Sequence, residues 1–388
     1  MLWCTPAEAG FSPGRLDRAW AVLRSAAGTE SVPAAVAAVG RGRGAVVPRA
    51  FGWAVYTPED ERVAAAPDTP FDLASLTKAV ATAPATWALI ERGRLRLADR
   101  VAEFLPAFGS GAAADPADGR AAVTVAHLLT HTAGLPAHAA MPAEARDDPD
   151  RLAWAAAVPL AAAPGQRCVY SDVGFMILGR VVEAVAGRPL HDFCRDVLFQ
   201  PLGMAATCWN PPAALAARAA ATEWLDGDPA ASRPGGYLRG VVHDWKARWA
   251  GRACGHAGLF STAPDLAVFA DMLLHAGRGG AAAPRRVLSA AAVEAMTKAV
   301  PVGDGIYRTR GWDGPGRAGL PPGPGDLWTR TGFGHTGFTG TSLWIDPGRD
   351  VWVVLLTNAI HLRREAARPT MTRLRRYFHN AVVAALGE

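Results

Sequence analysis

The segment from Ser75 to Lys78 places a hydroxyl group and an amine three residues apart, which puts both on one face of a helix. A serine hydroxyl is a weak nucleophile until a base removes its proton, and lysine acts as that base when burial and nearby cations lower its pKa. Arginine stays protonated and cannot take this role. Among the 40 lysines and arginines of the chain, only Lys78, Lys246 and Lys298 are lysine. The lysine at position 78 therefore predicts covalent catalysis by Ser75.

A serine and a lysine at this spacing also occur by chance, but two further motifs follow them along the chain. Tyr-Ser-Asp at 170–172 begins an apolar helical pattern, and His-Thr-Gly at 335–337 leads into a predicted β-hairpin. The order of the three motifs resembles that of the penicillin-recognising serine hydrolases, which include penicillin-binding-protein-like D-peptidases, class C β-lactamases and family VIII-type carboxylesterases. The linking segments 124–136 and 255–274 resemble that family too, so the resemblance extends over residues 13–358.

The resemblance implies a role for each residue that matches a motif. Ser75 would be the acylated nucleophile, Lys78 its base partner, and Tyr170 would share the proton transfers. The backbone N–H groups of Ser75 and Phe338 would form the oxyanion hole that stabilises the tetrahedral intermediate. The resemblance implies neither a cofactor nor a metal.

The other two residues of the His-Thr-Gly motif, Thr336 and Gly337, would line the strand edge against which substrate docks. Two positions depart from the common family pattern. Asp172 stands where many relatives have asparagine; an ionised carboxylate only accepts hydrogen bonds, and its charge tends to keep Lys78 protonated. If Asp172 lies beside Lys78, Tyr170 is favoured for the proton-transfer role, and whether Lys78 or Tyr170 is the main base stays open. His335 replaces the commoner lysine and is mostly neutral at pH 7. Both changes argue against an efficient β-lactamase and favour an ester substrate.

These residues predict a serine hydrolase that forms an acyl-enzyme on Ser75 and acts as a carboxylesterase on small esters. Several alternatives stay open. A D-peptidase or muramoyl-peptide amidase acting on cell-wall fragments is one, because Tyr-Ser-Asp resembles a subgroup related to muramoyl-peptide amidases. A weak β-lactamase and an acyltransferase are others. The intact Ser/Lys/Tyr set argues against a non-catalytic binding protein of the same fold. The expected partner is a small ester or amide; the oligomeric state is open.

Two other patterns that suggest chemistry have simpler interpretations. Ser12 lies in a GxSxG sequence, but a nucleophile elbow needs a strand before the serine, and Pro13 instead favours a helix N-cap at Ser12. His127 and His131 share the i, i+4 spacing of metal ligands, yet no third ligand follows, so we expect them to pack or to form hydrogen bonds. No role is assigned to three further polar residues near the predicted cleft: His243, Asp244 and His256.

The elements that must position the site predict an α+β fold with one β-lactamase-like domain over residues 1–388. Strands at both chain ends would form an antiparallel sheet flanked by helices, and a mainly helical lobe would be inserted between them. The α/β lobe would comprise 1–74 and about 250–388, and the helical lobe about 75–249, with the site in the cleft between them. The predicted strands are 32–40, 44–56 and the hairpin 339–358. The predicted helices are 12–26, 72–92, 124–131, 172–187, 191–203, 263–277 and 370–386. We expect a long surface loop over 303–334.

Composition limits the remaining classes of function. Half of the 388 residues are hydrophobic, which is enough for a large core. The net charge is +5 with scattered basic residues, so we expect no nucleic-acid partner; the arginines near the C-terminal helix predict a solvated face. The five cysteines have irregular spacings, the first residues lack a signal-peptide pattern, and no apolar run is long enough for a bilayer. The expectation is a cytoplasmic protein that does not bind membranes.

Overall fold

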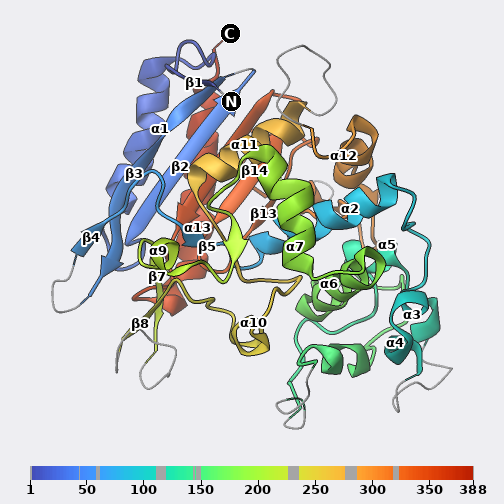
Figure 1. The fold of residues 1–388 in the computed structure, drawn as a ribbon. Helices are drawn as coiled ribbons and strands as arrows, with labels where there is room; N and C mark the ends of the chain where they lie inside the picture. The colour runs from blue at the N-terminus through green and yellow to red at the C-terminus, as the bar shows by residue number, and fades with distance from the viewer. Residues whose placement is uncertain are drawn as a thin grey trace.

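The largest sheet of the described chain has seven strands, and Figure 1 shows it beside the mainly helical part of the molecule. The computed structural model describes residues 2–42, 44–57, 62–110, 119–142, 145, 150–225, 236–275, 286–317 and 323–387. The strands run in the order β1-β3-β2-β15-β14-β13, with β4 paired to β3. All of these pairs are antiparallel except β1–β3. The bounds are β1 Leu2–Cys4, β2 Ala34–Arg41, β3 Gly44–Tyr56, β4 Arg62–Ala64, β13 Phe333–Thr336, β14 Ser342–Asp346 and β15 Val351–Thr357.

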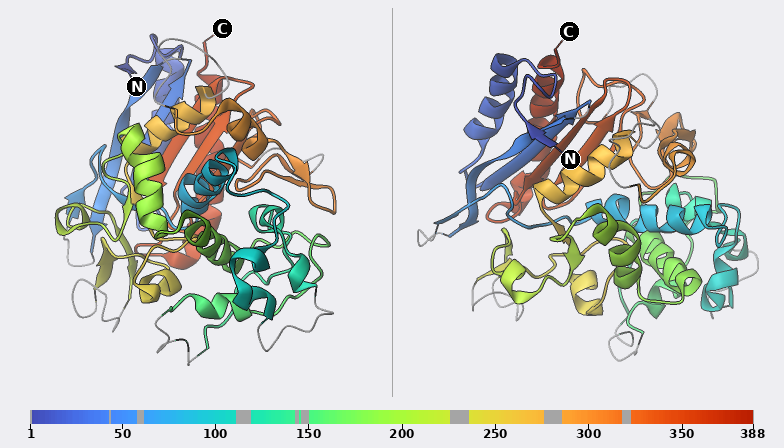
Figure 2. Two further views of the ribbon diagram at one scale, coloured as in Figure 1. Left: turned by 45° about the vertical axis from the view of Figure 1, so that its right-hand side comes forward. Right: turned by 45° about the horizontal axis from the view of Figure 1, so that its top comes forward.

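Helices cover both faces of this sheet, which explains why its central strands are almost continuously apolar. On β15, Val354 and Leu356 join the core cluster that includes α11 (Ala263–His275), whereas Val353 and Leu355 join the opposite cluster. Successive strand side chains point to opposite faces, so a strand buried on both sides needs apolar residues at every position. Helices α1 (Pro13–Ala26) and α13 (Arg364–Ala384) lie side by side on the second face (Figure 2).

The second part of the molecule is mainly helical and lies at one end of the sheet (Figure 1). Its longest helix, α6 (Asp172–Ala186), is buried along most of its length and packs against the helix that follows Ser75. The other α-helices are α2 Ala83–Glu91, α3 Val101–Phe104, α4 Pro106–Ser110, α5 Val125–Leu129, α7 Leu190–Cys194, α8 Gln200–Leu202, α9 Ala213–Ala216, α10 Trp245–Ala250 and α12 Ala290–Thr297. Two π-helical turns, Lys78–Thr82 before α2 and Arg195–Phe199 before α8, and two 3-10 helices, Arg120–Ala122 and Ala153–Ala157, complete the helical elements of the described chain. Short sheets are formed by β5 Phe71–Asp72, β9 Leu259–Ser261 and β6 Cys208–Trp209, by β7 Ala221–Trp224 and β8 Tyr237–Arg239, and by β10 Val300–Pro301, β11 Ile306–Arg308 and β12 Gly316–Arg317.

The predicted α+β class is confirmed, and β2, β3, β14 and β15 correspond to the predicted strands. The lobe boundaries near residues 74 and 250 stay a prediction. The larger core cluster contains side chains from both predicted lobes, among them Val36 and Phe175, so the two parts share apolar packing.

Three predicted elements are wrong in part. The helix expected from Asp72 begins only after Ser75, because Phe71 and Asp72 pair with β9 as a short strand. The segment 303–334 is not only a surface loop: it contributes β11 and β12 and buries Trp312 completely; its residues 318–322 lie outside the described part. The closing helix, predicted to begin at residue 370, starts at Arg364 and contains Pro369 in its second turn. Residues 276–277 of the predicted helix 263–277 also lie outside the described part.

Candidate active site

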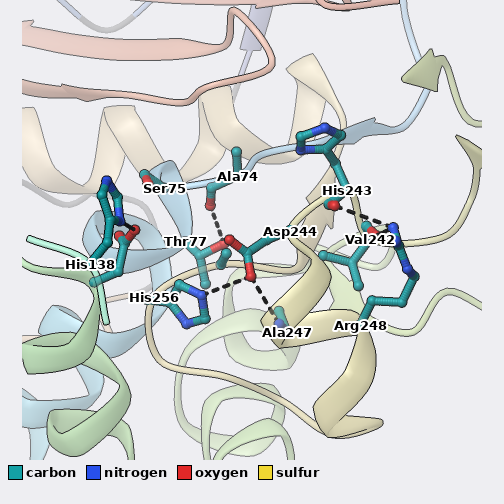
Figure 3. Close-up of polar contacts among 12 residues, drawn as sticks. Ala74, Ser75, Thr77, His138, Val242, His243, Asp244, Ala247, Arg248 and His256 are labelled. Atoms are coloured by element: carbon teal, nitrogen blue, oxygen red, sulfur yellow. Dashed lines mark hydrogen bonds and ion pairs between the residues drawn. The ribbon is translucent and has the colours of Figure 1, made fainter. Parts of the chain in front are cut away.

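Ser75 lies on a sharp turn between β5 and the buried helix that carries Lys78. The turn requires Ala74 to adopt a left-handed conformation with φ of 47°, which costs roughly 1–2 kcal/mol for a residue other than glycine. Two hydrogen bonds hold it there: the Ala74 N–H donates to Asp72 Oδ1 at 2.8 Å, and the Thr77 hydroxyl donates to the Ala74 carbonyl at 2.6 Å. Figure 3 shows the second of these, between Thr77 and Ala74. The strained turn presents the Ser75 hydroxyl to a cavity.

That cavity has a volume of about 1160 Å³ and lies where the end of β13, the start of α6, α10 and α13 meet. All but one of the predicted site residues line the cavity. The exception is Lys78, whose side chain is fully buried. The structure therefore brings together the three motifs, which are separated by up to 260 positions in the sequence. The lining members are Ser75, Tyr170, Asp172, His335, Thr336, Gly337 and Phe338.

The Lys78 ammonium group has three hydrogen-bond acceptors, one for each of its protons. They are Ser75 Oγ at 2.9 Å, Asp172 Oδ1 at 2.7 Å and the His256 carbonyl at 3.0 Å. Burial alone lowers the pKa of Lys78, but the neighbouring Tyr170 and the Asp172 carboxylate outweigh it, so the pKa of Lys78 is raised above its ordinary value. Lys78 is therefore charged in the resting site.

The Tyr170 side chain lies over Lys78, with the ammonium nitrogen 4.9 Å from the ring centroid. Its hydroxyl lies near both Lys78 and Ser75, which influence its pKa. Burial raises the pKa of Tyr170 and the Lys78 charge lowers it, with a net increase, so Tyr170 rests as a neutral phenol. The nucleophile thus contacts a charged lysine and lies next to a neutral tyrosine.

His131 positions the Tyr-Ser-Asp motif. Its ring packs against that of Tyr170, with centroids 4.6 Å apart and planes tilted by 33°, and its Nδ1 accepts the Ser171 N–H at 3.0 Å. Burial holds the pKa of His131 well below its ordinary value, which keeps Nδ1 available as an acceptor. His127 instead takes part in a capping box at the start of α5 with Thr124. Among the described residues, no group of three histidine, cysteine or acidic side chains is placed to hold a metal.

The opposite wall is formed by the end of β13 and the residues after it. Within the described part of the chain, the amides of Ser75 and Phe338 have no hydrogen-bond acceptor, as an oxyanion hole requires. Gly337 permits the close approach of the two segments, because a Cβ atom there would lie 2.3 Å from the Leu73 carbonyl oxygen. His335 donates its Nδ1 proton to the Thr336 carbonyl at 2.8 Å, and burial lowers its pKa to about 4, so it stays neutral.

A model of the beta-lactamase family matches residues 21–375. The chain belongs to the beta-lactamase family of serine hydrolases. The resemblance seen in its three motifs is thereby confirmed. A relative from Escherichia coli K12 named "Putative D-alanyl-D-alanine carboxypeptidase" is 34% identical over 321 residues, which cover 78% of this chain and 72% of the relative. A relative of the same name from Salmonella schwarzengrund is 31% identical over 382 residues, covering 92% and 85%.

Solved structures show the same beta-lactamase fold. EstCE1, described as a hydrolase with promiscuous acyltransferase activity, superposes with a TM-score of 0.72 at 23% identity and covers 95% of this chain and 99% of its own. A penicillin-binding protein homologue from Caulobacter crescentus gives a TM-score of 0.70 at 23% identity, with coverage of 96% and 99%. In this member of the family, none of the described helices is long and apolar enough to cross a bilayer.

This beta-lactamase-family site also contains residues that sequence reasoning missed. Arg308 lines the cavity, forms an ion pair with Asp313 at 2.6 Å and lies 6.0 Å from the Tyr170 ring centroid. Arg375 of α13 donates to the Thr341 carbonyl at 2.9 Å beside the His-Thr-Gly strand. Positive charge is therefore present near His335 although the histidine itself is neutral. No local pattern marked Arg308, which lies in a Gly/Pro-rich segment interpreted as a surface loop.

Proposed function

We propose that this chain is a carboxylesterase that hydrolyses small esters through an acyl-enzyme on Ser75. The observation that carries the proposal is the Ser75 hydroxyl, 2.9 Å from the Lys78 amine, at a cavity wall where two unbonded amides are available. The Ser75 oxygen attacks the substrate carbonyl carbon, and the carbonyl oxygen becomes an oxyanion at the amides of Ser75 and Phe338.

The Tyr170–Lys78 pair first loses one proton to solvent, because the resting site holds a charged lysine and a neutral tyrosine. The pair then accepts the proton of Ser75, whose hydroxyl lies 2.9 Å from the Lys78 nitrogen. Collapse of the intermediate breaks the bond to the leaving oxygen, and the pair returns the proton to the departing alcohol. In deacylation, water takes the place of the alcohol and attacks the acyl carbon while the pair accepts its proton. The bond from Ser75 to the acyl group then breaks, the pair returns the proton to Ser75, and the acid is released. Both acylation and deacylation take place at Ser75, and each requires that Lys78 or Tyr170 can lose a proton and so act as the base.

Two groups at the cavity wall support an ester over a β-lactam or a peptide. The Asp172 carboxylate accepts hydrogen bonds and cannot donate one to the carbonyl of a substrate amide. His335 is neutral and supplies no charge to a substrate carboxylate. An ester with an uncharged acyl group needs neither interaction.

A D-peptidase acting on cell-wall fragments is the second candidate. Arg308 supplies a guanidinium group in the cavity that was not expected from the His-Thr-Gly motif, and it could bind a terminal carboxylate. The names of the curated relatives support the same activity. If an alcohol or amine replaced water as the acceptor, the same acyl-enzyme would make the chain an acyltransferase, the activity that EstCE1 is described as having.

The experiment compares the wild type with Ser75→Ala on a short-chain nitrophenyl ester, a D-amino-acid amide and a β-lactam. We expect the highest kcat/KM on the ester, loss of that activity in Ser75→Ala, and labelling of Ser75 by a fluorophosphonate. Ser12→Ala is the matched control, because Ser12 begins α1 without a side-chain cap and should retain full activity. Full ester hydrolysis by Ser75→Ala would overturn the proposal, and a higher kcat/KM on the D-amino-acid amide would favour the second candidate.

A further inference from the structure

The two amides of the oxyanion hole belong to chain segments that meet only in the folded protein. The Ser75 amide lies on the turn after β5, and the Phe338 amide follows β13. Each must point at one oxygen, and loss of a single donor in such sites lowers kcat by about 10²–10³. The residues that hold these two segments in register are therefore of direct interest for catalysis.

Asp72 forms hydrogen bonds that connect the two segments. Its buried carboxylate accepts the Ala74 N–H at 2.8 Å and the His243 N–H at 2.7 Å. Its backbone carbonyl accepts the Thr339 hydroxyl at 2.8 Å. One residue therefore fixes the turn before Ser75, the loop that carries His243 and the segment just after Phe338.

The His243 side chain extends this connection to Phe338 itself. The two rings are stacked, with centroids 5.5 Å apart and planes 21° apart. The backbone of His243 is also held by Arg248 of α10, which donates to the carbonyls of Val242 and His243 at 3.1 and 3.3 Å (Figure 3). His243 is thus fixed at both its amide and its carbonyl, and its ring forms a rigid support for Phe338.

A charged group holds the far end of the His243 ring. Glu223 of β7 lies 2.6 Å from His243 Nε2, and both of its oxygens lie 3.0 Å from Nη1 of Arg364 at the start of α13. The Arg364 guanidinium in turn lies 5.3 Å from the Phe338 ring centroid. Glu223 is only 12% exposed, so this bridge is shielded from solvent on one side.

Phe338 itself is 51% exposed, unlike most large apolar side chains of the chain. Burial therefore contributes little to keeping its side chain in place. We propose that Glu223, His243 and Arg364, anchored through Asp72, are positioning residues that hold Phe338 so that its amide and that of Ser75 point at the same oxygen. This inference rests on the proposed function, because it concerns the oxyanion of that acyl transfer.

The test uses Glu223→Ala and the milder Glu223→Gln, assayed with a short-chain nitrophenyl ester and with an alkyl boronic acid that forms a tetrahedral adduct with Ser75. We expect Glu223→Ala to lower kcat about tenfold with less than about twofold change in KM, because the donor is displaced but not removed. The Ki of the boronic acid should rise by about the same factor. Glutamine, whose amide oxygen can still accept the His243 proton, should recover part of the loss.

Glu30→Ala is the matched control, because it breaks an exposed ion pair to Arg363, one residue before Arg364, and touches no cavity residue. It should leave kcat, KM and Ki unchanged. An unchanged kcat and an unchanged Ki of the boronic acid in both Glu223 variants would overturn the inference, and a raised KM beside them would make the cluster a wall of the substrate site. A wild type that neither hydrolyses the ester nor is labelled at Ser75 would instead refute the proposed function, and the inference with it.

Discussion

Asp172→Asn tests the charge balance of the site most directly. The Asp172 carboxylate lies 2.7 Å from the Lys78 ammonium, whose side chain is fully buried. Two unit charges at that separation attract each other by about 6 kcal/mol at an effective dielectric constant near 20. Asparagine keeps the shape and one acceptor oxygen but removes the charge. If Lys78 kept its proton, loss of its partner would lower the free energy of unfolding by about 3–5 kcal/mol.

Lys78 can avoid that penalty by releasing its proton. Without the carboxylate, burial, the largest influence on this pKa, is opposed mainly by Tyr170, and we predict that the pKa of Lys78 falls below its ordinary value. In the wild type the raised pKa stabilises the fold at every pH below the unfolded pKa of about 10.4, and this contribution is lost only as the pH rises through the folded pKa. In the variant the lowered pKa destabilises the fold at low pH, and the penalty shrinks as the pH rises toward about 10.4.

Urea denaturation at pH 6 and pH 9 distinguishes the two cases. We expect Asp172→Asn to lose about 3 kcal/mol at pH 6 and markedly less at pH 9. The acid limb of its kcat/KM profile should also extend to lower pH, because a neutral lysine becomes available sooner. Asp17→Asn, which removes the exposed partner of Arg49, is the control and should show no such pH dependence. Equal losses at both pH values would show that Lys78 keeps its proton and would refute the reasoning from burial.

Two further substitutions test the tyrosine and the strained turn. Tyr170→Phe removes the hydroxyl that lies near Ser75 and Lys78. We expect kcat on a nitrophenyl ester to fall by about 10²–10⁴ while the thermal midpoint stays close to that of the wild type. A fall of less than about threefold would exclude Tyr170 from proton transfer. Ala74→Gly removes the left-handed strain at φ of 47°. Because the unfolded chain gains entropy with glycine, we expect a net rise of only about 0.5–1 kcal/mol in the free energy of unfolding, measured by urea denaturation. A lower stability than that of the wild type would show that the turn is not strained.

Much of the fold could be predicted because its signals are local. The strands that became β2, β3 and β15 are apolar runs long enough to identify, and α6 has helical spacing with Gly187 as its C-cap. The short strand β5 could not be predicted, because it consists of two residues whose partner strand β9 lies almost 190 positions later. Trp312 is buried in a segment rich in glycine and proline, where composition indicated a loop on the surface.

The site shows the same limit. Ser75, Lys78 and Tyr170 could be predicted because each lies in a motif whose residue types carry the chemistry. Asp72 and Glu223 could not, because their roles depend on tertiary contacts: Asp72 accepts an amide two residues away and another 171 residues away. An acidic residue with such partners has no distinguishing pattern in the sequence, and only the folded chain shows what its carboxylate holds.

The charged state of Lys78 sharpens the reason for a lysine at this position. In the resting site Lys78 is charged and Tyr170 is neutral, so the pair must lose one proton before it can accept the proton of Ser75. Because the two groups are strongly coupled, the apparent pKa of that loss belongs to the pair and not to either residue. An arginine would keep its proton throughout. By stabilising the charged lysine, Asp172 raises the pH at which the pair becomes a base. The main consequence of an aspartate in place of asparagine is therefore a changed pH dependence of acylation, and its effect on the choice of substrate is secondary.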